Sequence, residues 1–396
     1  MKIESIKLKN FKSLQDIYIN NIPSFCILIG PNGVGKSSLF DVFGFLQHSL
    51  TYNVSTAIKH RGGWKEVVSR GHENENITIE FKSRIKINKV DRLVTYSLEL
   101  TNKANKIEVA REELSYKRGS AGSPFKFFKF NFGEGEAVVN EEDFSTETKK
   151  LNKEPQNLEN SDILAIKGLG QFQKFKAANA FRQLIEKWHF SDFHIGSPLA
   201  SKDIAGQSVH LSETGDNIQL VANRLFSEQS EILKKIIVKM KDKVPSIESI
   251  FTELSHDGRL LLKFKDLSFI DPFTDKFVSD GTIKLFAYLL LLYDSNPHPL
   301  LCVEEPEKQL YPPLLEELAE EFRLYSSQYN GEGGQVFVST HSPDFLNAAN
   351  IEEVFFLTKK DGFTKIFRAK DDEQICEYIK NGAKMGYLWQ HNVFPF

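Results

Sequence analysis

The chain has 396 residues, 41% of them hydrophobic, and a formal net charge of −3. This length and apolar content allow a substantial buried core divided among two or three domains. The net charge argues neither for nor against nucleic-acid binding, because local patches of charge decide that property.

Composition and apolar run lengths exclude a disulfide framework and a membrane span. Three cysteines, Cys26, Cys302 and Cys376, have neither the number nor the spacing for a disulfide framework or a zinc site. The longest apolar stretch, 285–293, is far shorter than a membrane span, and residues 1–4 lack the apolar core of a signal peptide. We therefore expect a protein of the reducing cytoplasm, with no membrane contact.

The first predicted elements are strands. Residues 2–10 and 15–20 alternate between apolar and polar types, which predicts a hairpin, and the apolar run 25–29 predicts a buried strand. The same alternation at 76–100 and 105–117 predicts an antiparallel β-lobe.

A glycine-rich loop follows the buried strand. Residues 30–38 read Gly-Pro-Asn-Gly-Val-Gly-Lys-Ser-Ser, and a helix is expected from Ser37 to Leu46. The glycines let backbone N–H groups face phosphate oxygens at the helix N-terminus. Lys36 can reach the β- and γ-phosphates, and Ser37 can ligate Mg²⁺. The alternative is a strand-to-helix turn without a ligand.

The middle of the chain, 134–271, interrupts the pattern. The polar stretch 134–162 predicts a mobile loop, whereas 171–189 and 216–241 have helical periodicity. No long heptad run is present, which excludes an extended coiled-coil arm. The first helical stretch carries aromatic residues that we expect in the core rather than on a base-stacking platform: Phe172, Phe175, Phe181 and Trp188.

Charge is uneven along these segments. Residues 82–129 carry twelve Lys or Arg against five Asp or Glu, whereas 134–162 carry nine acids against three bases. A basic β-lobe could follow a phosphate backbone. The equally good alternative is a solvated strand face with balancing acids nearby.

The last third begins with a capped helix. Residues 277–282 read Phe-Val-Ser-Asp-Gly-Thr and precede an apolar helix expected at 283–293. Ser279 is a good N-cap, and Gly281 allows close backbone approach, so this segment can be a second anion-binding helix start. The alternative is an ordinary capped helix.

Two strands then end in polar residues. The strand at 299–303 leads into Glu304 and Glu305, and strand alternation sends these side chains to opposite sides. We assign Glu304 to Mg²⁺, directly or through water, and Glu305 to polarising the attacking water. Solvated acids at a strand end are the alternative. The strand at 335–338 leads to His341, at the edge where α/β sheets bind ligands, which favours a γ-phosphate contact over a structural role.

With these motifs in this order, the chain resembles the ABC-type P-loop ATPases of the RecF, SMC and OLD group. The resemblance rests on Asn10-Phe11-Lys12-Ser13, the Walker A loop at 30–38, the signature-like 278–282, the Walker B acids with Glu-Pro-Glu at 305–307, and His341 in the switch position. It implies an α/β fold: an ABC-type P-loop head with an antiparallel β-lobe, a mixed sheet core and a helical insertion. The expected domains are residues 1–133, the insertion 134–271, and residues 272–396.

The resemblance also implies ATP and Mg²⁺ as cofactors. Lys36, Glu305 and His341 would serve hydrolysis, and Ser37 and Glu304 would hold the metal. One chain would bind ATP through Lys12, Ser13, Asn32, Gly33, Gly35, Lys36, Ser37 and Ser38, and a second copy would face it with Ser279 and Gly281. The implied partner is a second copy, in a head-to-head dimer or a higher oligomer.

Some positions depart from the family pattern. Glu304 stands where the family usually has Asp, and Tyr311 precedes Pro312 where related proteins have His-Pro. The Gln of the Q-loop stays unassigned among Gln47, Gln171 and Gln173.

Three functions remain open. The first is an ATP-gated scaffold in antiphage defence that controls a separate nuclease or toxin, and the second is a RecF-like clamp that binds DNA. The third, a non-hydrolysing ATP-bound scaffold, conflicts with the base Glu305. The Ser-Asp-Gly-Thr signature and Glu-Pro-Glu resemble the defence group more closely.

The end of the chain is expected to hold a strand pair near 353–368 and a short helix near 372–380. That is too little for the Toprim nuclease domain of OLD proteins, and no spare acid cluster follows a strand, so we expect this chain not to be a nuclease. Its tail aromatics suggest a docking edge or a packed terminus: Tyr387, Trp389, Phe394 and Phe396.

Overall fold

The computed structural model describes residues 2–87, 90–117, 124–139, 151–193, 210–228, 230–256, 258–327 and 334–395. Contacts divide the chain into two compact units, and each is described by itself. Unit 1 comprises residues 1–188, 352–376 and 394–396, and unit 2 comprises 189–351 and 377–393.

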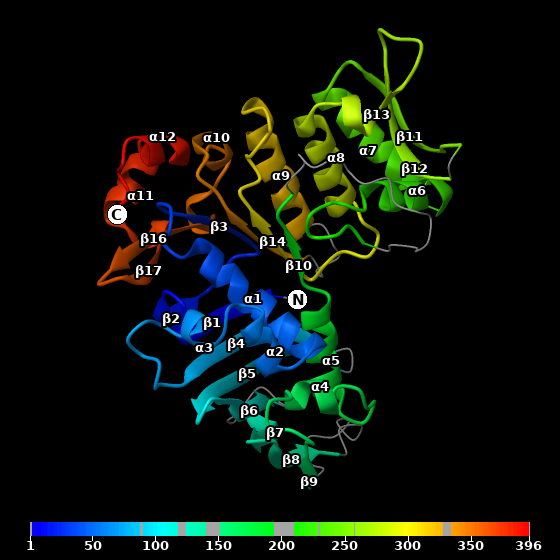
Figure 1. Ribbon diagram of the computed structural model, residues 1–396. Coiled ribbons are helices and arrows are strands. Elements are labelled where there is room, and N and C mark those ends of the chain that lie inside the picture. The colour runs from blue at the N-terminus through cyan, green and yellow to red at the C-terminus, as the bar shows by residue number, and fades with distance from the viewer. Residues whose placement is uncertain are drawn as a thin grey trace. The chain divides into compact units, whose positions relative to one another are not determined.

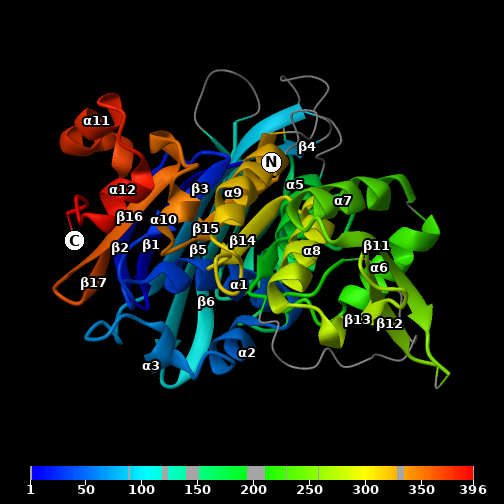
Figure 2. The same ribbon diagram turned by 90° about the horizontal axis from the view of Figure 1, so that it is seen from above.

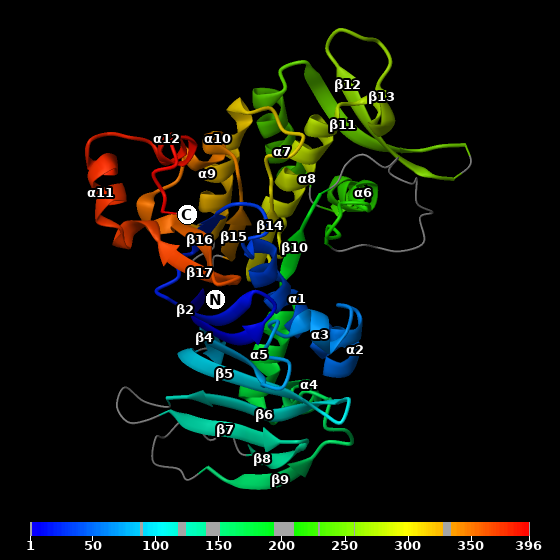
Figure 3. The same ribbon diagram turned by 60° about the vertical axis from the view of Figure 1, so that its left-hand side comes forward.

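A large antiparallel sheet dominates unit 1, with the strand order β2-β1-β4-β5-β6-β7-β8-β9 (Figure 1; Figure 3 shows the strands one below another). The strands are β1 (Lys2–Phe11), β2 (Leu14–Asn20), β4 (Ile77–Ile87), β5 (Val90–Lys103), β6 (Lys106–Tyr116), β7 (Phe125–Asn131), β8 (Glu134–Val138) and β9 (Lys153–Asn157). Buried and exposed residues alternate along β4, as expected for a sheet with one covered face. The predicted N-terminal hairpin and β-lobe are confirmed.

Helix α5 (Lys176–Glu186) packs against this sheet. The Phe181 ring lies 5.0 Å from that of Tyr96, and the Trp188 ring lies 6.1 Å from that of Phe81. Phe175 is buried as well, so the core expectation is confirmed for three of the four aromatic residues. It is wrong for Phe172, which is 59% exposed.

Unit 1 also contains the P-loop strand and helix. Strand β3 (Phe25–Ile29) is buried throughout and pairs in parallel with β16 (Val354–Lys360), which forms a hairpin with β17 (Phe363–Arg368). The predicted strand pair is therefore confirmed. The helices of this unit include α1 (Lys36–Thr51), α2 (Val54–Lys59), α3 (Trp64–Val67), α4 (Ala165–Leu169) and the 3-10 helix η4 (Ala369–Asp371).

In unit 2, β10 (His189–Ser191), β14 (Leu300–Glu304) and β15 (Gln335–Ser339) run parallel. Their side chains are buried on both faces, as in parallel sheets that helices cover. Helix α8 (Asp280–Leu292) is buried along most of its length because it is apolar all round. The other helices wholly in this unit are α6 (Ile218–Glu228), α7 (Ser230–Lys243), η2 (Asp275–Phe277), α9 (Pro313–Ser327), α10 (Pro343–Leu346) and α12 (Met385–Gln390).

A second, three-stranded sheet of unit 2 is formed by β11 (Ile247–Leu254), β12 (Leu260–Asp266) and β13 (Phe273–Thr274), beside α6 and α7 (Figure 2). The 3-10 helix η3 (Ile351–Glu353) and helix α11 (Glu373–Lys380) each include residues of both units. Helix α11 lies where a short helix was predicted. Across the described residues, no helix is long and apolar enough to cross a membrane.

The segment 134–271 carries both helices and strands. Helices α5, α6 and α7 lie in or close to the predicted helical stretches, whereas α4 precedes the first of them and was not predicted. Strands β8 and β9 extend the large sheet. The expected mobile loop is therefore wrong for the residues that form β8 and β9, and its part at 140–150 lies outside the described residues.

The tail aromatics are divided between core and surface. Phe394 is buried with its ring 5.6 Å from that of Phe356, and the indole of Trp389 is partly buried. Tyr387 is exposed, and Phe396 lies outside the described residues.

Candidate nucleotide-binding site

The P-loop of unit 1 joins β3 to α1. Gly35, the N-cap of α1, has φ of 110°, and in the described part of the chain no side chain caps this helix. A Cβ at Gly35 would collide with Thr364 Oγ1 and would lie 2.6 Å from Ser13 Oγ. Because Gly35 has no side chain to fill this space and the N–H groups at the start of α1 have no side-chain cap, the loop forms a cradle suited to a phosphate anion.

Lys36 folds back onto its own loop. Its Nζ donates to the carbonyl of Gly30 at 2.7 Å and to that of Pro31 at 3.2 Å, and the residue is only 6% exposed. The ammonium is thus held at the loop by carbonyl oxygens, and phosphate oxygens can replace them as acceptors.

Thr364 of β17 is a loop contact that sequence reasoning missed. Its hydroxyl can donate to the Val34 carbonyl at 2.7 Å and lies 2.8 Å from Ser13 Oγ, while its N–H donates to the Ser13 carbonyl at 2.8 Å. Thr364 thereby ties the P-loop to the turn between β1 and β2. No sequence signal indicates this, since the residues are more than 300 positions apart.

The segment at 10–13 lies beside the loop, as the resemblance implies. Lys12 has φ of 50°, and its Nζ lies 2.6 Å from Oδ2 of Asp41 on α1. The other carboxylate oxygen of Asp41, Oδ1, accepts a hydrogen bond from Arg61 Nε at 2.7 Å. Ser13 Oγ lies 3.5 Å from Ser38 Oγ. Asp41, which sequence reasoning also missed, holds Lys12 against the P-loop helix.

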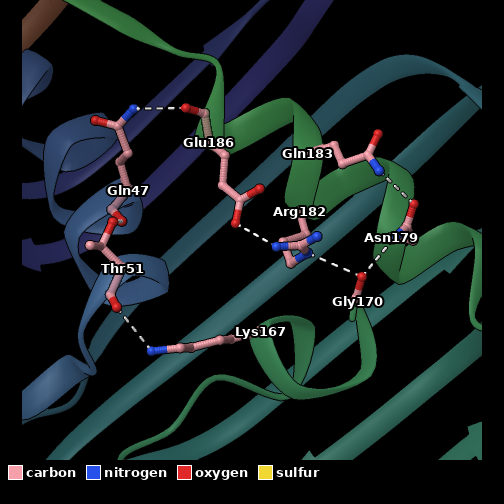
Figure 4. A network of polar contacts seen from close by, with 8 residues as sticks. All are labelled: Gln47, Thr51, Lys167, Gly170, Asn179, Arg182, Gln183 and Glu186. Carbon is pink, nitrogen blue, oxygen red and sulfur yellow. Dashed lines mark hydrogen bonds and ion pairs between the residues drawn. The ribbon is translucent and has the colours of Figure 1, made fainter. Parts of the chain in front are cut away.

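Gln47 has a structural contact. Its amide donates to the carbonyls of Glu186 and Trp188 at 3.3 and 2.8 Å, which ties α1 to the end of α5 (Figure 4). In the same network Lys167 donates to the Thr51 carbonyl at 3.1 Å. Gln171 and Gln173 are exposed. Since Gln47 has a structural contact and the other two glutamines lie at the surface, the Q-loop role stays unassigned.

In unit 2, the Walker B acids lie where β14 ends. Glu304 is the last strand residue and pairs in register with Ser339. Glu305 already has φ of 43°, and its N–H donates to the Ser339 carbonyl at 2.8 Å. The strand alternation used to orient the two carboxylates therefore stops at Glu304.

The expected base and the switch histidine are close together. Glu305 Oε1 lies 3.8 Å from His341 Nε2, and Glu305 Oε2 lies 2.9 Å from Lys308 Nζ. The backbone N–H of His341 donates to Glu307 Oε1 at 2.7 Å. Burial raises the pKa of Glu307, and the His341 N–H opposes that shift. Glu307 was missed as a site residue, although it is the third acid of the Glu-Glu-Pro-Glu run.

The signature segment begins α8 as predicted. Ser279 is the N-cap, and its Oγ accepts from the Thr282 N–H at 3.2 Å. A Cβ at Gly281 would lie 2.6 Å from the Gln309 carbonyl oxygen, so the close approach is made by this chain's own backbone. Ser279 is exposed to solvent.

No group of three or more His, Cys, Asp or Glu in the described residues is placed to hold a metal ion.

Comparison with known proteins agrees with this geometry. The family model described as "AAA domain, putative AbiEii toxin, Type IV TA system" matches residues 25–347. The DNA replication and repair protein RecF of Lactococcus lactis subsp. cremoris is 25% identical over 145 residues, which are 35% of this chain and 40% of that protein. RecF of Corynebacterium jeikeium is 28% identical over 78 residues, 20% of this chain and 17% of that protein. The chain thus matches less than half of these relatives' length.

Among solved structures, an SMC head bound to the C-winged helix domain of ScpA aligns over 93% of this chain and 98% of that chain. The TM-score is 0.54 at 13% identity, which shows a shared fold. The expected fold class is confirmed: an SMC-head-like, ABC-type P-loop fold with an antiparallel lobe and parallel core strands. The chain is similar in part to RecF and shares the fold of an SMC head, and because the family match spans most of its length, it belongs to this AAA-domain family of P-loop ATPases.

Proposed function

We propose that this chain is an ATP-hydrolysing head that assembles around nucleotide and gates a separate effector protein in antiphage defence. Two observations carry the proposal, one in each unit. The chain has a P-loop at the uncapped start of α1 and a carboxylate beside a histidine at the end of β14.

Each site residue has a proposed role. Lys36 leaves its loop carbonyls to contact the β- and γ-phosphates, and Glu305 takes the proton of the attacking water while His341 contacts the γ-phosphate. Mg²⁺, bound with Ser37 and Glu304, would neutralise phosphate charge. The remaining ATP contacts are proposed for Lys12, Ser13, Asn32, Gly33, Gly35 and Ser38.

The proposed partner is a second copy of the chain. Ser279 is exposed at the N-terminus of the 13-residue helix α8, where backbone dipoles favour an anion. Ser279 and Gly281 would face the ATP bound by the other copy. The division into an N-terminal head half, an insertion and a C-terminal head half stays part of this proposal.

Defence is supported by the family description, which names a toxin of a type IV toxin–antitoxin system. Cys26, Cys302 and Cys376 form no disulfide with one another in the described residues, which supports a reducing cytoplasm as the proposed compartment.

The concentration dependence of ATP hydrolysis tests this function. The purified chain with Mg²⁺ should release phosphate from ATP, and its specific activity should rise with protein concentration because each site needs a second copy. A constant specific activity over a hundredfold dilution would contradict assembly, and no phosphate release would leave the non-hydrolysing scaffold.

A RecF-like DNA clamp is the second candidate, favoured by the RecF matches. Part of the positive charge of the lobe is neutralised by neighbouring acids. Arg84 lies 2.8 Å from Glu4, and Arg111 and Lys126 lie 2.8 and 2.9 Å from Glu113, so acids balance these bases. ATP-dependent duplex binding that weakens steeply with salt would support this candidate.

A further inference from the structure

A cavity of about 250 Å³ lies in unit 1 where β2 and β17 run side by side (Figure 1 and Figure 3). Aliphatic and aromatic residues of β2, β16 and β17 line it, among them Ile19, Phe355 and Ile366. Of the described residues that line it, none belongs to the P-loop at 30–38 or to the segment 10–13. The cavity is therefore separate from the proposed nucleotide site. Its volume lies below the range of about 300–1,000 Å³ usual for drug-sized ligands, so it suits a smaller molecule.

Arg368 brings a positive charge to this cavity. It is the last residue of β17, and its Cζ lies over the Phe355 ring, 5.4 Å from the ring centroid. Its Nε is buried and, in the described part of the chain, has no hydrogen-bond partner. A buried N–H without an acceptor is unfavourable, and the planar guanidinium matches the two oxygens of a carboxylate. A carboxylate that enters the cavity would supply that acceptor.

An acid of opposite charge lines the same cavity. Asp371 is exposed and ends η4, the 3-10 helix of which Arg368 is the N-cap. Since a 3-10 helix has three residues per turn, side chains three positions apart leave the same side. Within the described residues, no ion pair joins Arg368 and Asp371 to each other or to a third residue. The neighbouring Asp372 is already engaged, because its Oδ1 accepts from the Ile375 N–H at 3.0 Å.

We propose that this cavity is a binding site for a free α-amino acid with a large apolar side chain. Arg368 holds its carboxylate, Asp371 holds its ammonium, and its side chain lies against the apolar lining. A simple carboxylate pairs with Arg368 but meets the like charge of Asp371, and a simple amine meets the reverse arrangement. A zwitterion satisfies both groups. The site goes beyond the proposed ATPase function and does not depend on it.

Three matched probes test the ligand class. L-Phenylalanine carries both charges, 3-phenylpropionate lacks the ammonium, and 2-phenylethylamine lacks the carboxylate. In titrations of the full chain followed by saturation-transfer difference NMR, L-phenylalanine should bind about tenfold or more tightly than either analogue, because each analogue leaves one charged group unpaired. Equal affinity for L-phenylalanine and either analogue would overturn the zwitterion assignment. No binding of L-phenylalanine, L-leucine or L-tyrosine would overturn the site.

Crossed variants assign the two charges. Arg368→Met should weaken L-phenylalanine binding about tenfold or more but leave 2-phenylethylamine binding no weaker, because that probe has no carboxylate. Arg368→Lys keeps the charge without the planar fork, so its affinity should lie between those of wild type and Arg368→Met. Asp371→Asn should weaken L-phenylalanine binding but not 3-phenylpropionate binding. A merely structural role would weaken all three probes together.

Two control variants remove the same charges elsewhere in unit 1. Arg84→Met removes an arginine that lies 2.8 Å from Glu4, and Asp361→Asn removes an exposed acid from the turn between β16 and β17. Neither residue lines the cavity, so both variants should bind L-phenylalanine as wild type does. Thermal unfolding without ligand identifies variants that fail to fold, and Asp371→Asn still gives a result if Arg368→Met does not fold. Wild-type affinity in every folded variant of Arg368 and Asp371, or an equal loss in the controls, would overturn the site.

Discussion

Lys36 and Thr364 both contact the P-loop, Lys36 as the proposed phosphate ligand and Thr364 as a support of the loop backbone. The Lys36 ammonium is held at the loop by two carbonyls, and the buried Thr364 hydroxyl ties Val34 to Ser13. Replacing either should impair nucleotide binding, but for different reasons.

Lys36→Ala should abolish hydrolysis, because removing the ammonium leaves the transferred phosphoryl charge uncompensated. Affinity for ATP should also fall. Phosphate release and fluorescent ATP-analogue titration measure the two effects, with Lys59→Ala on the exposed side of α2 as control. Turnover at the wild-type rate would remove the Walker A assignment.

Thr364→Val keeps the shape of the side chain but leaves the Val34 carbonyl without its hydroxyl donor. We expect ATP to bind about tenfold more weakly, whereas Thr364→Ser should bind nearly as wild type. Thr358→Val, a partly buried threonine on the neighbouring strand β16, is the control. Equal affinities for all three variants would show that Thr364 does not support the loop.

At the scale of elements, a buried carboxylate joins the large sheet to α4. Glu112 of β6 accepts hydrogen bonds from the N–H groups of Ala165 and Ile166 and from the Tyr96 hydroxyl. Burial raises the pKa of Glu112 to about 7, and these three hydrogen bonds only partly offset it.

The pH dependence of unfolding follows from that shift. Between the ordinary carboxyl pKa, near 4.5, and about 7, the folded state keeps a proton that the unfolded chain has lost. Stability should therefore fall as pH rises through this window, by about 1–3 kcal/mol in the free energy of unfolding. Urea titrations at pH 5 and pH 8 measure the difference, and Glu112→Gln should reduce it. An unchanged difference in this variant would assign the effect to other groups.

The sequence pattern in this region placed the start of one helix too early. The periodicity at 171–189 predicts a helix, and α5 lies within this range but begins only at Lys176, after a turn that follows α4. The intervening turn is stabilised at Gly170, whose carbonyl accepts from Asn179 at 2.6 Å and Arg182 at 3.1 Å (Figure 4). These contacts reach across a turn, beyond the range of helical periodicity.

At the scale of the whole molecule, Glu305→Gln should trap ATP, because the amide keeps the size of the carboxylate but cannot take a proton from water. Sedimentation velocity should then show a larger ATP-dependent assembly than in wild type. Adding Ser279→Arg should prevent it, since the guanidinium fills the start of α8. A fixed oligomer that ATP leaves unchanged would count against closure around nucleotide.

The chain should not cut DNA by itself. We expect purified protein to hydrolyse ATP and leave plasmid intact with Mg²⁺ or Mn²⁺, since the proposed role of this chain is to gate a separate effector. Toxicity in cells should need a partner. Cleavage by highly pure protein that disappears on mutating a residue of this chain would overturn this prediction.

The sequence alone determined the features that depend on neighbours along the chain. The P-loop, the N-cap at Ser279, the strand that ends at Glu304 and the alternating strands of the lobe follow from local backbone and hydrophobic preferences, and each lies where it was predicted. Only the tertiary structure decided which distant side chains complete the site. Thr364 reaches the P-loop because β17 pairs with β16, which pairs with β3, and Glu307 holds His341 because β14 pairs with β15. Such contacts depend on the path of the whole chain, and no local pattern encodes that path.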